Sequence, residues 1–520
     1  MSDNVRQLLE QRVAAYGNKP FLFSETDGRQ WTYAEFDHSV NGTANLLLAN
    51  GIAKGDVVSL LMPNSPEYII AYFACWKIGA IAGPVNSLLK SEEIEWVVNN
   101  SESKLLLSEP PASAGGTGDA TTTTRFGIPN VALDLANLPA ADASGSDIFI
   151  DPDDDAIIIY TSGTTGKPKG CLLTHGNLLA NAQQIAEWMG FGEDDRLLTV
   201  MPLFHMNAVS VTTMTALYAG GSTVVSPKFS ASRFWDIIEK YKITSFGSVA
   251  TMLSMLLQKN AEFGIQNSER NPKSKIQNPK SLRFAMCGSA PVPAEVLNRF
   301  EETFGVLVIE GYGLSESTCR STFNPPNKER RPGSCGKPIG NEMAIFNEND
   351  EPQPDGELGE IVLRGPNICK GYFKNPYATE TAFANGWFHT GDIGYRDADG
   401  FYYIADRKSD MIIRGGENIY PREIDDVLYT HPAVAAAACI GVPDDLYGEE
   451  VAAFIVLKAE TRSVGSVPAA PQVTEQDIIN FCKQHLADYK CPKTVHFLDD
   501  IPKGPTGKLL KRELAKLVTK

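Results

Sequence analysis

The stretch DDAIIIYTSGTTGKPKG, residues 154–170, joins a short apolar run to a loop of glycines, hydroxyl side chains and lysines. The β-branched run at 154–160 predicts a buried strand, and KGCLLTHGN (169–177) predicts a second strand before any helix. Backbone N–H groups, hydroxyls and cations together suit a polyphosphate. We therefore favour a phosphate-binding loop here, with a plain β-turn as the alternative.

Two familiar nucleotide-binding patterns do not fit this loop. The P-loop needs four residues between its glycines and Ser or Thr after its lysine. Here two residues separate Gly163 from Gly166, and Pro168 follows Lys167. The Rossmann pattern also fails, because no third glycine stands two residues before Gly163. The loop belongs to neither class.

Strand-like and helix-like segments alternate on both sides of the loop. DVVSLLM (56–62) precedes the helical pattern SPEYIIAYFACWKIG (65–79), and RLLTVMP (196–202) is followed by GGSTVVSP (220–227) and SRFWDIIEKYKI (232–243). This βαβ alternation predicts largely parallel sheets. We expect two α/β subdomains before residue ~330.

The pattern changes near residue 336. EMAIFN (342–347), GELGEIVLRG (356–365) and GFYYIADR (400–407) are short strand patterns with Gly and Asp turns, which predict a small β-barrel or antiparallel sheet. The last part predicts a separate α+β unit of about 110 residues with a helix near 474–487. We therefore expect an α/β fold with an N-terminal domain over 1–407 and a C-terminal domain over 408–520.

Composition excludes several functional classes. The 520 residues include 47 basic and 63 acidic side chains, a formal net charge of −16, which disfavours nucleic acid as a partner. No segment reaches the ~18 apolar residues of a membrane helix, so we expect no integral membrane segment. The nine cysteines form no C-x-x-C pair, which favours reduced cysteines in a cytoplasmic protein and disfavours a cysteine metal site.

The loop YTSGTTGKPKG (160–170) resembles the signature loop of the adenylate-forming superfamily, which includes acyl-CoA synthetases, adenylation domains and firefly luciferase. Further motifs of that family follow in the family's order and cover essentially the whole chain. They are PLFHMN (202–207), GSAP (288–291), EGYGLSE (310–316), GWFHTGD (386–392), DRKSDMIIRGGENIYPREID (406–425) and PKGPTGKLLKREL (502–514).

The resemblance implies an AMP-forming acid:CoA ligase with ATP, Mg²⁺ and coenzyme A. In such enzymes a carboxylate attacks the α-phosphate of ATP to give acyl-AMP and pyrophosphate, and a thiol then displaces AMP. Lys508 would bridge the carboxylate and the α-phosphate, while Lys503, Lys511 and Arg512 have no assigned role. Glu316, with the Thr161 hydroxyl, would hold Mg²⁺.

The resemblance also implies the nucleotide site. Tyr312 would stack on adenine, Ser315 would contact the α-phosphate, Asp392 would accept from the ribose hydroxyls, and Arg407 would reach ribose and phosphate. The full set expected to bind ATP or AMP is Thr161, Ser162, Gly163, Thr164, Thr165, Gly166, Lys167, Gly288, Ser289, Ala290, Glu310, Gly311, Tyr312, Gly313, Ser315, Asp392, Arg407 and Lys508.

The second half-reaction implies a moving C-terminal domain. In the resembling enzymes this domain rotates about a hinge that falls here at DRKSD (406–410), where Ser409 replaces the usual Asp or Lys. Gly415 and Gly416 match the loop that lines the coenzyme A tunnel. His205 matches a residue that flanks the thiol channel, and the alternative for it is a packed core histidine.

The acid and the final acceptor stay open at this level. Amino-acid-activating relatives carry Asp where Met206 stands here, so an α-amino acid is disfavoured. The mostly apolar pocket candidates favour an aliphatic or fatty acid, with an aryl acid as alternative. They are His205, Met206, Asn207, Val249, Ala250, Gly311 and Leu314.

Coenzyme A is the favoured acceptor, because the hinge lacks the insertion typical of enzymes that load a carrier protein. A carrier-loading enzyme is the second hypothesis, and a catalytically inactive binding module is the third. Lys508, Glu316 and Asp392 argue against the third. The oligomeric state is open, with a homodimer as one option.

Overall fold

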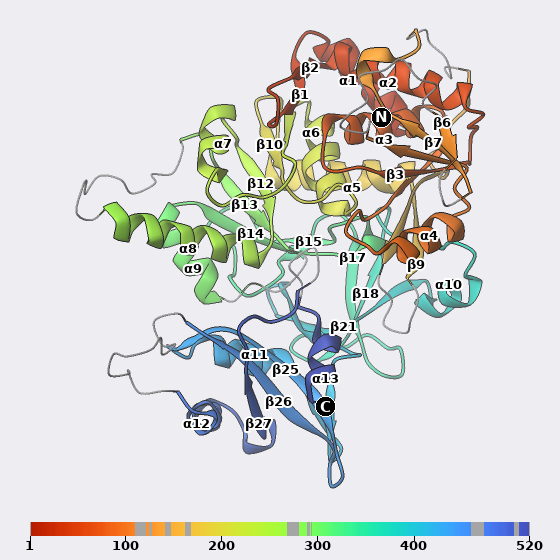
Figure 1. Cartoon of the computed structure of the whole chain (residues 1–520). Coiled ribbons are helices and arrows are strands. Elements are labelled where there is room, and N and C mark those ends of the chain that lie inside the picture. Colours follow the sequence, from red (N-terminus) through yellow and green to blue (C-terminus); the bar gives the residue numbers. More distant parts are fainter. Residues whose placement is uncertain are drawn as a thin grey trace.

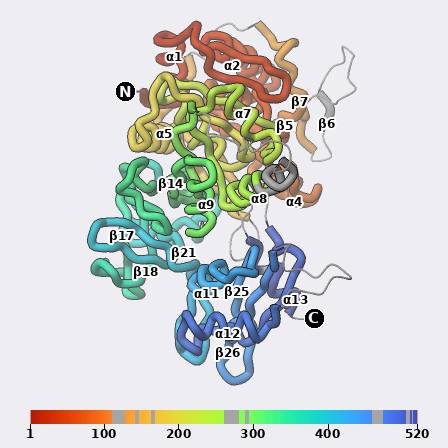
Figure 2. Tube along the Cα trace, turned by 90° about the vertical axis from the view of Figure 1, so that its left-hand side faces the viewer, coloured from red at the N-terminus to blue at the C-terminus, as the bar shows by residue number. Residues whose placement is uncertain are grey.

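The computed structural model describes residues 2–109, 121–123, 127–140, 147–161, 168–267, 280–288, 292, 294–458, 473–503 and 509–518. The described strands form four sheets. Two α/β sheets with their helices make up the upper part of Figure 1, and a smaller C-terminal part lies at the other end of the molecule. Figure 2 shows the same separation from the side.

The first α/β sheet has eight strands in the order β19-β9-β8-β4-β3-β5-β7-β6. Its centre, from β8 to β7, is parallel, whereas β9 runs antiparallel to β8. The strands are β3 (Val57–Leu61), β4 (Ile81–Pro84), β5 (Leu105–Ser108), β6 (Thr121–Thr123), β7 (Pro129–Ala132), β8 (Asp155–Thr161), β9 (Lys169–Thr174) and β19 (Gly371–Tyr372). Its helices are α3 (Pro66–Lys77) and α4 (Ser91–Asn100), with the short η1 (Leu135–Asn137) beyond β7.

The second α/β sheet has nine strands in the order β16-β15-β14-β13-β12-β10-β11-β1-β2, parallel from β14 to β1. The strands are β1 (Pro20–Ser24), β2 (Gln30–Thr32), β10 (Arg196–Thr199), β11 (Ser222–Val225), β12 (Ser245–Ser248), β13 (Phe284–Cys287), β14 (Leu307–Tyr312), β15 (Thr322–Phe323) and β16 (Lys337–Pro338). The associated helices are α1 (Val5–Tyr16), α2 (Tyr33–Ala49), α5 (His175–Met189), the π-helix η2 (Asn207–Met214), α6 (Thr215–Ala219), α7 (Phe234–Tyr241), α8 (Ala250–Asn267) and α9 (Ala294–Phe304).

Helix α3 explains why the two sheets share one core. It is apolar on nearly every side, and all its residues except Glu67 are buried. A helix with no polar face must be covered all round. One hydrophobic cluster accordingly joins α3 to residues of both sheets, and the Trp76 indole donates to the Ala156 carbonyl of β8 at 2.9 Å.

A five-stranded antiparallel sheet occupies the position of the predicted small barrel. Its strands are β17 (Glu342–Phe346), β18 (Gly359–Arg364), β20 (Phe383–Ala384), β21 (Trp387–Arg396) and β22 (Tyr402–Arg407), with α10 (Pro376–Ala382) before β20. Both β20 and β22 pair with β21. This register places Asp392 directly opposite Arg407.

The C-terminal part has its own sheet and core. The strands are β23 (Ile412–Arg414), β24 (Glu417–Ile419), β25 (Val434–Asp444), β26 (Gly448–Leu457) and β27 (Thr494–Phe497), and the helices are α11 (Pro421–Tyr429), α12 (Glu475–His485), η5 (Asp488–Lys490) and α13 (Lys511–Val518). The helix expected near 474–487 is confirmed, because Thr474 caps α12 in a capping box with Asp477. No described helix is long and apolar enough to cross a bilayer.

Candidate active site

The predicted phosphate loop lies between two strands that define its position. β8 ends at Thr161 and β9 begins at Lys169, and these two residues pair across the sheet. The loop residues Ser162, Gly163, Thr164, Thr165, Gly166 and Lys167 lie outside the described residues, as do Ser289, Ala290 and Lys508. Their roles stay predictions.

Three predicted nucleotide residues meet at the junction of β14, β21 and β22. The Tyr312 hydroxyl donates to Oδ2 of Asp392 at 2.6 Å, and Nε of Arg407 lies 3.1 Å from Oδ1 of the same carboxylate. Asp392 is 4% exposed, whereas the Arg407 side chain keeps more than a third of its surface exposed. One buried carboxylate therefore fixes both an aromatic ring and an accessible cation.

The charges in this cluster are strongly coupled. Burial, and then the carboxylate of Asp392, raise the pKa of the Tyr312 phenol well above its usual value, so the hydroxyl stays protonated and can donate. Burial acts to lower the pKa of the Arg407 guanidinium, but Asp392 and Glu316 are among the groups that raise it overall. Arg407 therefore stays charged beside the Asp392 carboxylate.

Glu316 sits in the short 3₁₀-helix η3 (Ser315–Ser317), after β14. Its Oε1 accepts from the Tyr372 hydroxyl at 3.0 Å, and the Lys169 ammonium lies 5.1 Å from the centroid of the Tyr372 ring. Tyr372 lies on β19, which pairs with β9, and β9 in turn pairs with β8, where Thr161 lies opposite Lys169. Tyr372 thus connects Glu316 to this pair of strands. Carboxylate and hydroxyl oxygens at this place fit Mg²⁺, which takes oxygen ligands and shares them with phosphates and water.

Among the described residues no group of three or more His, Cys, Asp or Glu side chains could hold an ion by itself. Mg²⁺ commonly binds through one or two carboxylates plus substrate phosphates. That Glu316 and Thr161 hold an ion that arrives with a polyphosphate stays a prediction.

Three of the predicted glycines lie where neighbouring segments approach the ends of β13 and β14 closely. A Cβ at Gly311 would lie 2.4 Å from the Phe323 ring, and one at Gly313 would lie 2.0 Å from the Cys319 carbonyl oxygen. At Gly288 a Cβ would meet the Arg320 guanidinium at 2.6 Å. A side chain at any of these positions would therefore clash with backbone atoms of a neighbouring segment as well.

Some of the acid-pocket candidates lie at or beside the π-helix η2. Met206, Asn207 and Val249 are buried, and a Cβ at Gly247 would lie 2.6 Å from Oδ1 of Asn207. The others sit at element ends, with Ala250 opening α8 and Leu314 preceding η3. Single π-turns often mark functional sites in helices.

His205 precedes this helix as a neutral side chain. Burial lowers the pKa of His205 to about 4, so the imidazole is uncharged at neutral pH. Its ring lies 4.6 Å from that of Phe204, and its buried Nε2 has no hydrogen-bond partner among the described residues. The predicted channel role fits a neutral ring better than a cation.

The Glu310 carboxylate contacts the turn at Gly333. Its carboxylate accepts from the Gly333 backbone N–H at 3.1 Å, and burial raises the pKa of Glu310 to about 8. Because side chains alternate along a strand, Glu310 and Gly311 face opposite sides of the sheet. The predicted contact of Glu310 with the nucleotide stays a prediction.

The predicted hinge is a tight turn between two sheets. β22 ends at Arg407 and β23 begins at Ile412, and the Asp410 backbone N–H donates to the Arg407 carbonyl at 3.0 Å. Ser409 is exposed, and its hydroxyl donates to the Asp410 carboxylate at 3.0 Å. The Ser409 side chain therefore holds the turn locally.

Gly415 and Gly416 form the two-residue turn between β23 and β24. Their φ angles are +58° and +92°, and Arg414 pairs with Glu417 across the hairpin. Two positive φ angles in succession are typical of a type I′ turn, which favours glycine at both positions. The shape of this exposed loop therefore depends on backbone conformations that favour glycine.

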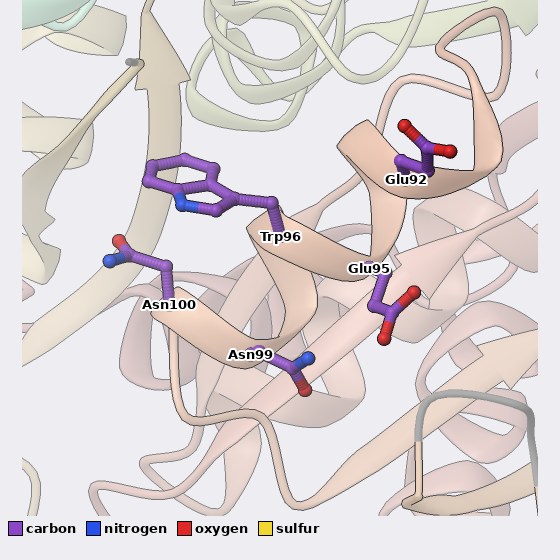
Figure 3. Close-up of a pocket in the computed structure, with 5 residues that line it drawn as sticks. All are labelled: Glu92, Glu95, Trp96, Asn99 and Asn100. Carbon is purple, nitrogen blue, oxygen red and sulfur yellow. The ribbon is translucent and has the colours of Figure 1, made fainter.

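A separate hollow lies on the outer side of α4 (Figure 3). It has a volume of about 450 Å³ and is lined by Glu92, Glu95, Trp96, Asn99 and Asn100. Its two carboxylates disfavour a polyphosphate. Trp96 instead packs edge-on against Tyr160 at 5.6 Å, and the Tyr160 hydroxyl donates to Asn100 at 2.8 Å. Two residues that line the hollow thus contact β8, the strand that precedes the predicted phosphate loop.

Two residues of the site were missed by sequence reasoning. Tyr372 gives no local signal, because GYF (371–373) belongs to no pattern that we considered. Arg320 is the only charged residue in STCRSTF (317–323), and a basic side chain in an uncharged run was a usable signal. The structure brings Tyr372 to Glu316 and Arg320 to Gly288.

Comparisons with known proteins agree with this geometry. The family model described as AMP-binding enzyme matches residues 9–373, and the model of the AMP-binding enzyme C-terminal domain matches residues 423–508. An oxalate–CoA ligase of Arabidopsis thaliana is 36% identical over 99% of this chain and 98% of its own length. A sulfoacetate–CoA ligase of Cupriavidus necator is 35% identical over 98% and 97%.

A solved structure supports the same assignment. An o-succinylbenzoate coenzyme A synthetase from Bacillus subtilis, in complex with ATP and a magnesium ion, superimposes with a TM-score of 0.82. It is 32% identical, and the match covers 98% of both chains. The chain belongs to the AMP-binding enzyme family of the adenylate-forming superfamily, beside its CoA ligases.

Proposed function

We propose that this chain is an AMP-forming acid:CoA ligase that activates an aliphatic carboxylic acid. The observation that carries the proposal is the cluster of Tyr312, Asp392 and Arg407, in which one buried carboxylate orients a ring and a cation. A carboxylate can accept from two hydroxyls of a ribose, and a ring can stack on a base. The Glu316 carboxylate is among the groups that raise the pKa of Arg407, and it would face the phosphates through Mg²⁺.

The reaction balances in two steps. A carboxylate oxygen of the acid forms a bond to the α-phosphorus of ATP as the bond to the β-phosphate oxygen breaks, and pyrophosphate leaves. The thiolate sulfur of coenzyme A then bonds to the acyl carbon as the bond to the AMP oxygen breaks. The first step brings two anions together, so it needs fixed cations, the role we assign to Lys508 and the loop 161–167.

We also propose that residues 408–520 move as a unit between these steps. The break between β22 and β23 supports this, because the two strands belong to different sheets and four residues separate them. The contacts that join the parts next to the hinge include two from Arg422 and two from Lys408. The Arg422 backbone N–H donates to Asp406 at 2.8 Å and its guanidinium donates to the Ile404 carbonyl. The Lys408 backbone N–H donates to the Gly391 carbonyl at 2.9 Å, and its ammonium lies 3.3 Å from the Glu360 carboxylate. Rotation would exchange these few contacts for others.

The acid pocket supports an aliphatic acid over an α-amino acid. Met206 and Val249 are apolar and buried, and a substrate ammonium would meet no carboxylate at position 206. An aryl acid is the alternative. The two relatives are named for oxalate and sulfoacetate, and each of those acids carries a second anionic group.

The tight hinge supports coenzyme A as the acceptor. Only residues 408–411 lie between β22 and β23, so there is no room for an added segment. The alternative acceptor is the phosphopantetheine of a carrier protein. An enzyme that loads a carrier should prefer the holo-carrier over free coenzyme A by orders of magnitude in kcat/KM.

The test is pyrophosphate release over a panel of acids, each with coenzyme A, with a holo-carrier protein or with no thiol. We expect at least one aliphatic acid to give sustained AMP release that depends on coenzyme A. An acyl-AMP that accumulates with coenzyme A but turns over with the holo-carrier would move the function to carrier loading. No acid-dependent release in any arm would overturn the proposal.

A His205→Ala variant should slow thiolation more than adenylation. The neutral ring borders the predicted thiol channel, so we expect the transfer to coenzyme A to fall about tenfold or more while pyrophosphate–ATP exchange changes little. Single-turnover measurements of each half-reaction would show the difference. His38→Ala, a change at an exposed histidine, is the matched control. Equal losses in both half-reactions would contradict a channel role.

A further inference from the structure

Arg320 is a buried cation without a full set of partners. It is 1% exposed, and its Nη1 donates to the neighbouring Cys319 carbonyl at 3.2 Å. Its Nε and Nη2 have no hydrogen-bond partner among the described residues. Burying a charge without a partner is costly, so a structure that keeps one usually pairs it with something else.

The guanidinium lies where ligands of α/β sheets bind. It covers Gly288, which follows β13, and a Cβ there would lie 2.6 Å from Nη2 and 2.8 Å from the Gly311 carbonyl oxygen. Ligands of such sheets bind outside the carboxyl ends of the parallel strands. Arg320 therefore stands at the end of the sheet where the acid pocket lies.

Asn207 lies over β12, the strand next to β13, on the same face of the sheet as the Arg320 guanidinium. Gly247 of β12 pairs with Met286 of β13, so by alternation Gly247 and Gly288 face the same side. Asn207 covers Gly247, and neither oxygen nor nitrogen of its buried amide has a partner among the described residues. A cation and an amide donor thus stand unpaired over adjacent strands.

The backbone of Arg320 is held rigidly. The Asn181 amide donates to the Arg320 carbonyl at 2.7 Å and the Asn367 amide donates to it at 3.1 Å. The Ser210 hydroxyl donates to Asn181 at 2.9 Å, which connects the segment to the helix that begins with Asn207. These bonds fix the main chain that carries the guanidinium, and a firmly held backbone favours a preorganised ligand site.

The buried carboxylate on the adjacent strand does not neutralise Arg320. Glu310 faces the other side of the sheet, where it accepts from the Gly333 N–H. On its own side Arg320 lies over the Phe323 ring, with 5.4 Å between Cζ and the ring centroid. An aromatic face attracts a cation but leaves its N–H groups unpaired.

We propose that Arg320 binds a second anionic group on the acid substrate, at the end opposite the carboxylate that is adenylated. The substrate class is then an aliphatic dicarboxylic acid or a sulfonated carboxylic acid, and the Asn207 amide can supply a further donor. A planar guanidinium matches a carboxylate or sulfonate with two parallel hydrogen bonds. This inference rests on the proposed adenylation of a carboxylic acid.

The proposal predicts a discrimination that an apolar pocket would not give. A fatty or other simple monoacid would leave the guanidinium buried and unpaired, and a site built for a polar group rejects an analogue that lacks it. We expect the wild-type enzyme to favour a diacid or a sulfonated acid over the monoacid of equal length by about 10²-fold or more in kcat/KM.

The experiment measures coenzyme A-dependent pyrophosphate release with matched acids. The pairs are malonate with propionate and succinate with butyrate, and sulfoacetate separates a sulfonate from a carboxylate preference. Arg320→Met should lower kcat/KM for the favoured anionic acid by about 10²- to 10³-fold and leave the monoacids unchanged or improved. Arg320→Lys keeps the positive charge but loses the planar guanidinium that can form two parallel hydrogen bonds. Its kcat/KM for the favoured anionic acid should therefore lie between those of the wild type and Arg320→Met.

Arg283→Met is the matched control. Arg283 precedes β13, at the end of that strand opposite to Gly288, and pairs with Asp195 at 2.8 Å, so the acid preference should not change. A wild-type preference for monoacids would overturn the inference, and so would equal losses for all acids in Arg320→Met. If that variant does not fold, the wild-type panel and Arg320→Lys still decide. No release with any acid would instead overturn the proposed function.

Discussion

A Lys508→Ala variant is expected to lose acid-dependent pyrophosphate–ATP exchange by about 10²- to 10³-fold or more. The attack of a carboxylate on the α-phosphate brings negative charges together, and we assign to this ammonium the task of following that charge. Transfer from a supplied acyl-AMP to coenzyme A should be spared, because no phosphate is attacked in that step. The two half-reactions are measured separately with the same protein.

Lys503→Ala is the control for the Lys508 variant. The Lys503 ammonium pairs with Asp500 at 2.7 Å, and the Asp500 side chain is largely exposed, so the loss of this pair should change neither half-reaction. Exchange that persists at the wild-type rate in Lys508→Ala would remove Lys508 from the reaction. A loss of both half-reactions would indicate damage to the C-terminal part.

An Asp392→Ala variant should raise the KM for ATP by roughly 30- to 100-fold, about 2–3 kcal/mol. The change removes the proposed ribose acceptor and leaves the Tyr312 hydroxyl and the Arg407 guanidinium without the carboxylate that orients them. Initial rates over a range of ATP concentrations, at saturating acid and coenzyme A, measure the effect.

Tyr312→Phe separates the two contributions of the Asp392 cluster. It keeps the ring for adenine and removes only the hydroxyl that donates to Asp392 at 2.6 Å, so the KM for ATP should rise less than about tenfold. An Asp392→Ala enzyme with an unchanged KM for ATP would contradict a ribose contact. Retained secondary structure in both variants would show that they fold.

The fold was predictable where the chain repeats a local pattern. The alternation of strand and helix patterns predicted both α/β sheets, and the apolar Val57–Leu61 and Asp155–Thr161 segments form strands as expected. The strand order was not predictable, because β1 pairs with β11 and β19 pairs with β9 across long stretches of sequence. Such pairings depend on tertiary packing and leave no local pattern.

The site was predictable from motifs but not from side-chain environments. The motifs brought Tyr312, Asp392 and Arg407 into one prediction, and the structure places them in contact. The pocket was expected to be mostly apolar, yet Arg320 lies buried beside Gly288. The uncharged run around Arg320 could have drawn attention to this residue, but its place beside Gly288 could not be predicted, because Asn181 and Asn367, which hold its backbone carbonyl, are distant in sequence.

The most direct test of the central claim is the identity of the nucleotide product. The purified chain is incubated with ATP, Mg²⁺, coenzyme A and the preferred acid, and the products are separated and quantified. We expect AMP, pyrophosphate and acyl-CoA in equal amounts, and none of them without the acid. ADP and phosphate as the products, or AMP formed at the same rate without acid, would contradict it.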